Sequence, residues 1–253
     1  MSAETNRQNG RVYLDHAATT EVLPAAIDAM VEQMRAGGNP SSLHALGRDA
    51  RATVEYARER IARAIGADPA EVIFTSGGTE ADNLAVKGIY WKRREEDARR
   101  TRILVSSIEH HAVEDTCEWL EKAEGAHIEW IPVDERGRVN PQTVRELIEK
   151  NPEDVALVTV MWANNEVGTV QPIPEIAAIA AEYGIPMHSD AVQAFGAVPI
   201  DFHASGTTTL AISGHKIGGP MGIGALIATR AVQMTPVLHG GGQERSVRSG
   251  TID

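Results

Sequence analysis

Short apolar runs rich in β-branched residues alternate along this chain with alanine-rich stretches of helical period. The apolar runs cover residues 71–75, 102–106, 128–132, 155–161, 185–189, 210–213 and 223–228. The expected helices cover residues 25–36, 45–65, 80–91, 111–122, 141–150 and 173–182. Strands that alternate with helices form a mostly parallel sheet with both faces covered. The sequence therefore predicts an α/β fold with a mostly parallel seven-stranded sheet and helices on both faces.

Composition excludes several classes of partner. The 253 residues carry a formal net charge of −11, which disfavours binding to the phosphate backbone of nucleic acids. Acidic residues interrupt the basic run at 92–102, so a solvated helix end explains it better than a basic patch. No window approaches the roughly 20 apolar residues of a membrane span. A single cysteine, Cys117, and a polar N-terminus without a signal peptide's apolar core predict a cytoplasmic protein.

Polar and glycine-rich segments follow several expected strands, at the edge where sheets of this kind bind ligands. Ser76-Gly77-Gly78-Thr79 follows the first strand and opens a helix, which suits an anion, although an ordinary strand–helix turn is the alternative. Asp190 ends a buried run, where a carboxylate needs either a positive partner or a capping role. Lys216 stands among glycines, where desolvation favours Schiff-base formation, although a surface lysine in a turn is the commoner case.

Other strand ends add candidates of the same kind. Of the adjacent histidines His110 and His111, one is a candidate acid, base or stacking partner; they make a poor metal pair, with no third ligand spaced to complete a site. Polar residues 164–168 follow another strand, and the glycine-rich segment 239–251 carries arginines and hydroxyls suited to anions. Together these residues meet the needs of pyridoxal 5'-phosphate: a lysine for the aldehyde, a carboxylate for the pyridinium nitrogen and a helix N-terminus for the phosphate.

The sequence resembles the cysteine desulfurases, which belong to the class V aminotransferase group of pyridoxal-phosphate enzymes. The resemblance lies in residues 13–20, 38–44, 75–83, 164–168, 188–193, 213–220 and 240–251. These segments occur in the family's order and spacing from about Val12 to the last residue. Ser-Gly-His-Lys at 213–216 and Arg-Ser-Gly-Thr at 248–251 are highly specific to the family.

The resemblance implies a role for each site residue. Lys216 would form the Schiff base and remove the Cα proton of the substrate, and Asp190 would pair with the pyridinium nitrogen. His110 would stack on the ring and act as the acid–base partner at the substrate thiol. The remaining cofactor contacts are Asn165 and Gln193 near the phenolic oxygen, Gly78, Thr79, Ser213 and His215 at the phosphate, and Thr251 reaching that phosphate from the partner subunit. No metal is implied.

The resemblance also implies a function. The complete enzyme would convert L-cysteine to L-alanine and pass the sulfur to an acceptor or scaffold protein of iron–sulfur or thio-cofactor assembly. It would act as a homodimer. A class V aminotransferase or a selenocysteine lyase with the same cofactor site is an alternative. A cofactor-binding dimerisation module without turnover is another.

The chain departs from the family in its length. Family members continue into a small domain with the nucleophilic cysteine and a carboxylate-binding arginine, so we expect a truncated form without persulfide chemistry. Cys117 lies mid-helix, where a structural role is expected. We expect residues 15–253 to form the cofactor-binding large domain. Residues 1–14 would pack with the absent small domain, so that apolar surface stays exposed and the chain tends to aggregate.

Overall fold

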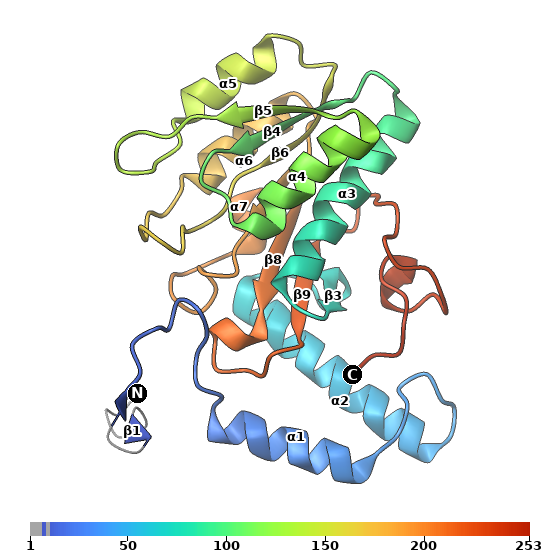
Figure 1. The fold of residues 1–253 in the computed structure, drawn as a ribbon. Coiled ribbons are helices and arrows are strands. Elements are labelled where there is room, and N and C mark those ends of the chain that lie inside the picture. The colour runs from blue at the N-terminus through green and yellow to red at the C-terminus, as the bar shows by residue number, and fades with distance from the viewer. Residues whose placement is uncertain (1–6, 9–10) are drawn as a thin grey trace.

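The computed structural model describes residues 7–8 and 11–253 (Figure 1). Its sheet has the strand order β3-β9-β8-β7-β6-β4-β5. Strand β9 pairs antiparallel with β3 and β8, and all other neighbours pair parallel. The strands are β3 (Val72–Thr75), β4 (Arg102–Ser106), β5 (His127–Ile131), β6 (Val155–Thr159), β7 (Met187–Asp190), β8 (Thr209–Ser213) and β9 (Gly224–Ala228). The predicted seven-stranded, mostly parallel sheet is confirmed.

The predicted helices are also present. They are α1 (Pro24–Ala36), α2 (Ala45–Ile65), α3 (Gly78–Glu96), α4 (His111–Glu124), α5 (Pro141–Glu149) and α6 (Ile173–Glu182). Helix α3 runs past the expected end at 91, and there Lys92 pairs with Glu95 at 3.0 Å and with Glu96 at 3.9 Å. The basic run therefore continues a charged helix end, as expected.

Shorter elements were not predicted. They are the hairpin β1 (Arg7–Gln8) and β2 (Arg11–Val12), the helix α7 (Phe202–Ser205) and the 3-10 turns η1 (Pro69–Glu71), η2 (Gly214–Lys216) and η3 (Glu244–Ser246). A four-residue helix has too little periodic pattern to be recognised, and α7 is fixed by the Asp201 cap on the Ala204 N–H at 2.9 Å.

Two apolar cores lie on the two faces of the sheet, as the fold class requires. Helices α2, α5, α6 and α7 cover one face, where Ile65, Ile148 and Phe202 are fully buried. Helices α3 and α4 cover the other, with Leu84 and Leu120 buried (Figure 1). Because successive strand residues point to opposite faces, each inner strand supplies both cores, which explains its continuous burial.

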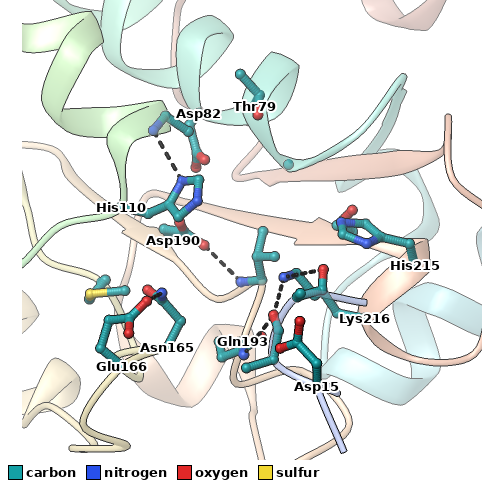
Figure 2. Close-up of a pocket in the computed structure, with 17 residues that line it drawn as sticks. Asp15, Thr79, Asp82, His110, Asn165, Glu166, Asp190, Gln193, His215 and Lys216 are labelled. Atoms are coloured by element: carbon teal, nitrogen blue, oxygen red, sulfur yellow. Dashed lines mark hydrogen bonds between the residues drawn. The ribbon is translucent and has the colours of Figure 1, made fainter. Parts of the chain in front are cut away.

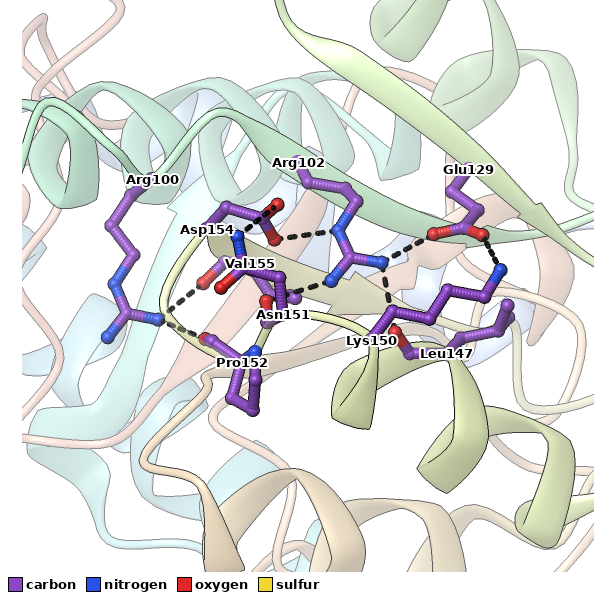
Figure 3. A network of polar contacts seen from close by, with 9 residues as sticks. All are labelled: Arg100, Arg102, Glu129, Leu147, Lys150, Asn151, Pro152, Asp154 and Val155. Atoms are coloured by element: carbon purple, nitrogen blue, oxygen red, sulfur yellow. Dashed lines mark hydrogen bonds and ion pairs between the residues drawn. The ribbon is translucent and has the colours of Figure 1, made fainter.

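A polar network crosses the N-terminal edge of the parallel strands (Figure 3). Arg102, which is 4% exposed, begins β4. Its guanidinium donates to Asp154 at 2.7 Å and Glu129 at 2.5 Å, and to the carbonyls of Leu147 and Asn151 at 2.9 Å. One side chain thus ties β4 to β5, to α5 and to the loop before β6.

The N-terminal segment contrasts with the rest of the fold. None of the α1 residues, all of them within the described part, is buried, and Leu14 and Met34 are 81% and 74% exposed. This exposure fits the predicted apolar surface; the expected packing of residues 1–14 lies partly outside the described residues and stays a prediction. In the part that the structure describes, no helix combines the length and the apolar character needed to cross a bilayer.

Candidate active site

A pocket of about 470 Å³ opens at the C-terminal edge of the sheet (Figure 2). Strands β6, β7 and β8 end here, and β3 leads into the same edge through the start of α3. Nine of the ten residues predicted from the sequence line it: Gly78, Thr79, His110, Asn165, Asp190, Gln193, Ser213, His215 and Lys216. Residues distant in sequence therefore meet at the edge that the strand order predicts.

The first turn of α3 forms one wall of the pocket. Gly78 begins the helix and Thr79 follows it, so N–H groups without helical partners lie at the pocket, where an anion is favoured. A Cβ on Gly78 would lie 2.6 Å from the side chain of Val192. Glycine is therefore needed for α3 to approach the segment after β7.

Asp190 ends β7 and is 4% exposed. One carboxylate oxygen accepts from the Val192 N–H at 2.8 Å. Burial, reinforced by the nearby charge of Asp82, raises the pKa of Asp190 to about 7. A cation placed against this carboxyl would relieve that cost, since opposite charge favours the ionised form. The sequence left a positive partner and a capping role open for Asp190; the bond from the Val192 N–H is of the capping kind, and a positive partner stays a prediction.

Three further polar groups beneath the pocket were missed in the sequence. Asp82, on α3, contacts His188 at 3.1 Å, and the other ring nitrogen of His188 contacts Thr209 at 3.0 Å. Burial raises the pKa of Asp82 and lowers that of His188 to about 4. Glu109 accepts from the Met161 N–H at 2.6 Å. The position of Asp82 three residues after Thr79, on the same helix face, was an available signal.

Glu109 differs from the other two because its second oxygen, Oε2, is buried and has no hydrogen-bond partner among the described residues. Burial, followed by the charge of Asp190, raises the pKa of Glu109 well above its ordinary value. Among the described residues, several carboxyl groups line the pocket and no buried arginine or lysine does. This surplus of acid is what a bound cation would offset.

Lys216 projects into the same pocket from η2, directly after β8. Its amine donates to the carbonyls of Ala17 and Ala18, the latter at 3.0 Å. Partial burial lowers the pKa of Lys216, although the charges of Asp190 and Asp15 oppose that shift. An amine with lowered proton affinity reaches its nucleophilic form more readily.

His110 and two amides complete the pocket. The Nδ1 atom of His110 accepts from the Ala112 N–H at 3.1 Å and caps α4, so the neutral ring carries its proton on Nε2. Asn165 donates to Glu166 at 2.8 Å, and Gln193 donates to the Ala17 carbonyl at 3.3 Å. The N-terminal segment thus closes one side of the pocket.

Thr251 is the exception among the predicted residues. It is exposed and does not line the pocket of its own chain. This placement agrees with a role at a second copy, which stays a prediction. Cys117 is fully buried on α4, and burial raises the pKa of its thiol well above the ordinary value. A buried, protonated thiol is unreactive, as expected for a structural cysteine.

The expectation that the adjacent histidines form no metal site stays a prediction, and one of them lies beside two acidic residues. His111 is exposed on the first turn of α4, and its Nδ1 lies 3.2 Å from Glu114 and 3.6 Å from Asp115. The ligand atoms of this trio lie within 4.8 Å of one another. Residues three and four apart share a helix face, which brings both acidic side chains to the His111 ring. Exposed acidic groups of this kind are common without a metal.

The fold and pocket together define a class of protein. A doubly wound α/β domain holds a lysine, a buried carboxyl group and a helix N-terminus around one pocket at the strand ends, which is the arrangement of an enzyme site. The model of the family described as aminotransferase class V matches residues 12–252. The chain therefore belongs to the class V aminotransferases, an enzyme family.

Its relatives narrow that class. The chain is 57% identical over 241 residues to the IscS-like cysteine desulfurase of Mycobacterium tuberculosis, covering 95% of this chain and 61% of that protein. It is 49% identical over 242 residues to the putative cysteine desulfurase IscS 1 of Bacillus subtilis, covering 95% and 62%. The chain thus spans about three fifths of the length of these curated relatives.

Solved structures agree with this assignment. The structure of SspA in complex with cysteine matches with a TM-score of 0.88 and 40% identity, covering 95% of this chain and 68% of that one. A NifS-like protein matches with a TM-score of 0.89 and 37% identity, covering 96% and 66%. The resemblance to cysteine desulfurases seen in the sequence is confirmed.

Proposed function

We propose that this chain carries the pyridoxal 5'-phosphate site of a cysteine desulfurase, in which L-cysteine is converted to L-alanine and its sulfur is transferred. The observation that carries the proposal is one pocket holding Lys216, Asp190 and the N-terminus of α3. These groups match the aldehyde, the ring nitrogen and the phosphate of that cofactor in chemical type. When bound, the cofactor supplies an electron sink for negative charge at the substrate Cα.

The residues of the chain have separate tasks in this proposal. Lys216 holds the cofactor aldehyde and, once displaced by substrate, accepts the Cα proton, for which its lowered pKa suits it. Asp190 keeps the ring nitrogen positively charged. His110 faces the pocket with a proton on Nε2 available to the substrate sulfur. Asn165 and Gln193 orient the phenolic oxygen.

The phosphate group is assigned to the α3 turn and to the end of β8. Gly78 and Thr79 contribute backbone N–H groups and a hydroxyl, and Ser213 and His215 line the same pocket. Burial, followed by the charge of Lys216, lowers the pKa of His215, and its Nδ1 lies 3.2 Å from the Thr19 hydroxyl. We propose that His215 binds phosphate as a neutral donor.

L-Cysteine as substrate is supported by the solved SspA complex with cysteine and by the desulfurase names of the relatives. Sulfur transfer needs an accessible thiol, and the single cysteine of these 253 residues, Cys117, is buried. We propose that the sulfur-accepting cysteine lies outside these residues. The complete protein would pass sulfur to an acceptor or scaffold protein of iron–sulfur or thio-cofactor assembly.

One preparation tests the cofactor assignment. The purified chain is mixed with pyridoxal phosphate and its visible absorption is recorded for the wild type, for Lys216→Ala and for the exposed-lysine control Lys150→Ala. We expect the visible absorption band of a protonated Schiff base in the wild type and in the control, and no such band in Lys216→Ala. A band that persists in Lys216→Ala would overturn the assignment.

L-Cysteine added to the loaded chain then tests the reaction. We expect the cofactor spectrum to change, because substrate displaces Lys216, while sulfide does not accumulate over many turnovers. Sustained sulfide release from these 253 residues would contradict the placement of the accepting thiol. An unchanged spectrum would contradict L-cysteine as substrate and favour a binding module.

Dimer formation is a separate part of the proposal. Thr251 lies outside its own pocket, so its assignment to the phosphate requires a second copy of the chain. Sedimentation equilibrium of the loaded protein should give the mass of a dimer. A monomer that binds the cofactor as tightly as the dimer does would show that Thr251 has no such role.

A further inference from the structure

Glu80 presents a problem for an anion at the α3 turn. It directly follows Thr79 on the first helical turn and lines a smaller cavity together with Gly78, Thr79 and Ser213. One of its carboxylate oxygens accepts from the Ser76 N–H at 2.6 Å, which closes the turn 76–80. The same carboxylate places a negative charge beside the N–H groups proposed to bind phosphate, and like charges at this range repel.

Arg248, which is distant in sequence, balances the negative charge of Glu80. Its Nε donates to Glu80 Oε1 at 2.8 Å and its Nη2 to Oε2 at 3.3 Å, a two-point contact between side chains that are 19% and 20% exposed. Burial alone would raise the pKa of Glu80, but the bonds from Arg248 and Ser76 lower it. Glu80 is therefore ionised and its charge is balanced by the guanidinium.

The segment that carries Arg248 is anchored against the strand leading into the turn. Glu244 accepts from Arg58 at 2.6 and 2.9 Å and from the Phe74 N–H of β3 at 2.6 Å. Glu244, Arg245 and Ser246 have φ values of 46°, 61° and 58°, a left-handed conformation that side chains disfavour. A strained backbone of this kind persists only where the surrounding contacts hold it, as the buried Arg58–Glu244 pair does here.

We propose that Arg248 is a positioning residue that neutralises Glu80, so that the turn 76–80 accepts the phosphate of the cofactor. The inference rests on the proposed function, because it assigns phosphate to that turn. Arg248 itself contacts the carboxylate of Glu80. Its effect on the cofactor is electrostatic, so it changes the affinity for the phosphate group much more than the affinity for the ring and aldehyde.

Pyridoxal and pyridoxal phosphate separate this effect from a structural one, because they share the aldehyde and ring and differ in the phosphate. Dissociation constants for both are measured by absorbance titration for the wild type, Arg248→Gln, Arg248→Lys and Glu80→Gln/Arg248→Gln. Glutamine at position 80 keeps an acceptor for the Ser76 N–H but carries no charge. Circular dichroism melts check that each variant is folded.

We expect Arg248→Gln to weaken pyridoxal phosphate binding roughly tenfold, as one unbalanced charge predicts, and pyridoxal binding less than threefold. Arg248→Lys keeps most of the affinity, and the double variant recovers it to within about threefold of the wild type. Equal weakening for both aldehydes, or a double variant as weak as Arg248→Gln, would overturn the proposal. Should Arg248→Gln fail to fold, Arg248→Lys and the double variant still decide it by their pyridoxal phosphate to pyridoxal ratio. A wild type without Lys216-dependent binding of either aldehyde would overturn the proposed function itself.

Discussion

The two edges of one sheet carry polar clusters of opposite character. At the N-terminal edge, Arg102 is matched by Glu129 and Asp154 and by two carbonyls (Figure 3). At the C-terminal edge, the carboxyl groups of Asp190 and Glu109 each accept one backbone N–H. Lys216, which lines the pocket with Asp190, donates to carbonyls instead (Figure 2).

The difference separates stability from function. Burial alone would raise the pKa of Glu129, but hydrogen bonds from Lys150 and Arg102 lower it, so its charge is accommodated in the folded state. Burial raises the pKa of Asp190 to about 7, so its charge is not accommodated there. A polar cluster complete within the chain stabilises the fold, and one incomplete within it marks where a ligand must complete it.

Replacing Arg102 with methionine should have the largest effect. It leaves Glu129 and Asp154 without their shared partner at a mostly buried position, so we expect a loss of about 3 kcal/mol in the free energy of unfolding, measured with urea. Arg100→Met is the matched control. Arg100 donates only to the carbonyls of Pro152 and Val155, so about 1 kcal/mol is expected. Equal losses would remove the distinction drawn for this edge.

At the other edge, Asp190→Asn should stabilise the cofactor-free chain, whereas Arg102→Met destabilises it. The folded pKa of Asp190, about 7, lies above its ordinary value of 3.8. Its contribution to stability is thus fully present below about pH 4 and lost as the pH rises through 7. We expect the substitution to leave the free energy of unfolding nearly unchanged at pH 4 and to raise it by about 4 kcal/mol at pH 8. Asp154→Asn, at the N-terminal edge, should instead destabilise the protein at pH 8.

His188 should contribute to the loss of folding stability at low pH. Burial lowers its folded pKa to about 4, below the ordinary 6.5, so its contribution is present above about pH 6.5 and lost as the pH falls toward 4. The His188→Gln variant should therefore lose stability over this range less steeply than the wild type, by about 1 kcal/mol per pH unit. Parallel unfolding curves for the two proteins between pH 6.5 and 4 would contradict this role.

Lys150→Met should have the smallest effect. Lys150 pairs with Glu129 at 2.6 Å, but its side chain is 60% exposed. Exposed ion pairs contribute little, so we expect a change of less than about 1 kcal/mol in the free energy of unfolding. A loss as large as that of Arg102→Met would show that the N-terminal edge depends on its whole charge network instead of on one buried arginine.

The fold is predictable because its signals are local. The sequence predicts the strand at 102–106 and the helix at 173–182 with the bounds that the structure has. In both elements the pattern of apolar residues is recognisable within ten residues or fewer. The bounds of α3 are predicted less well because its charged end, at 92–96, has no apolar period. Helix α7 was missed because it lacks the length to show one.

Lys216, Asp190 and the Gly78-Thr79 turn were also accessible to the sequence, because each directly follows or ends a strand and such ends share one edge of a parallel sheet. Asp82 had an available signal in its spacing from Thr79, but the contacts that Asp82, Glu109 and Arg248 make were not accessible. Their partners are 106 residues away for Asp82 with His188 and 168 for Arg248 with Glu80. Which side chains meet across such separations depends on how helices pack on the sheet.

The sequence by itself determined the sheet, its two covered faces and the residues placed at its ligand-binding edge. The tertiary structure decided which of those residues are charged, since protonation depends on burial and on neighbours that only packing brings together. It also decided that the carboxylate of Glu80, in the turn 76–80, is balanced by Arg248. The period of apolar residues can be recognised within a short stretch of sequence, whereas charge balance depends on contacts between residues that are distant in sequence.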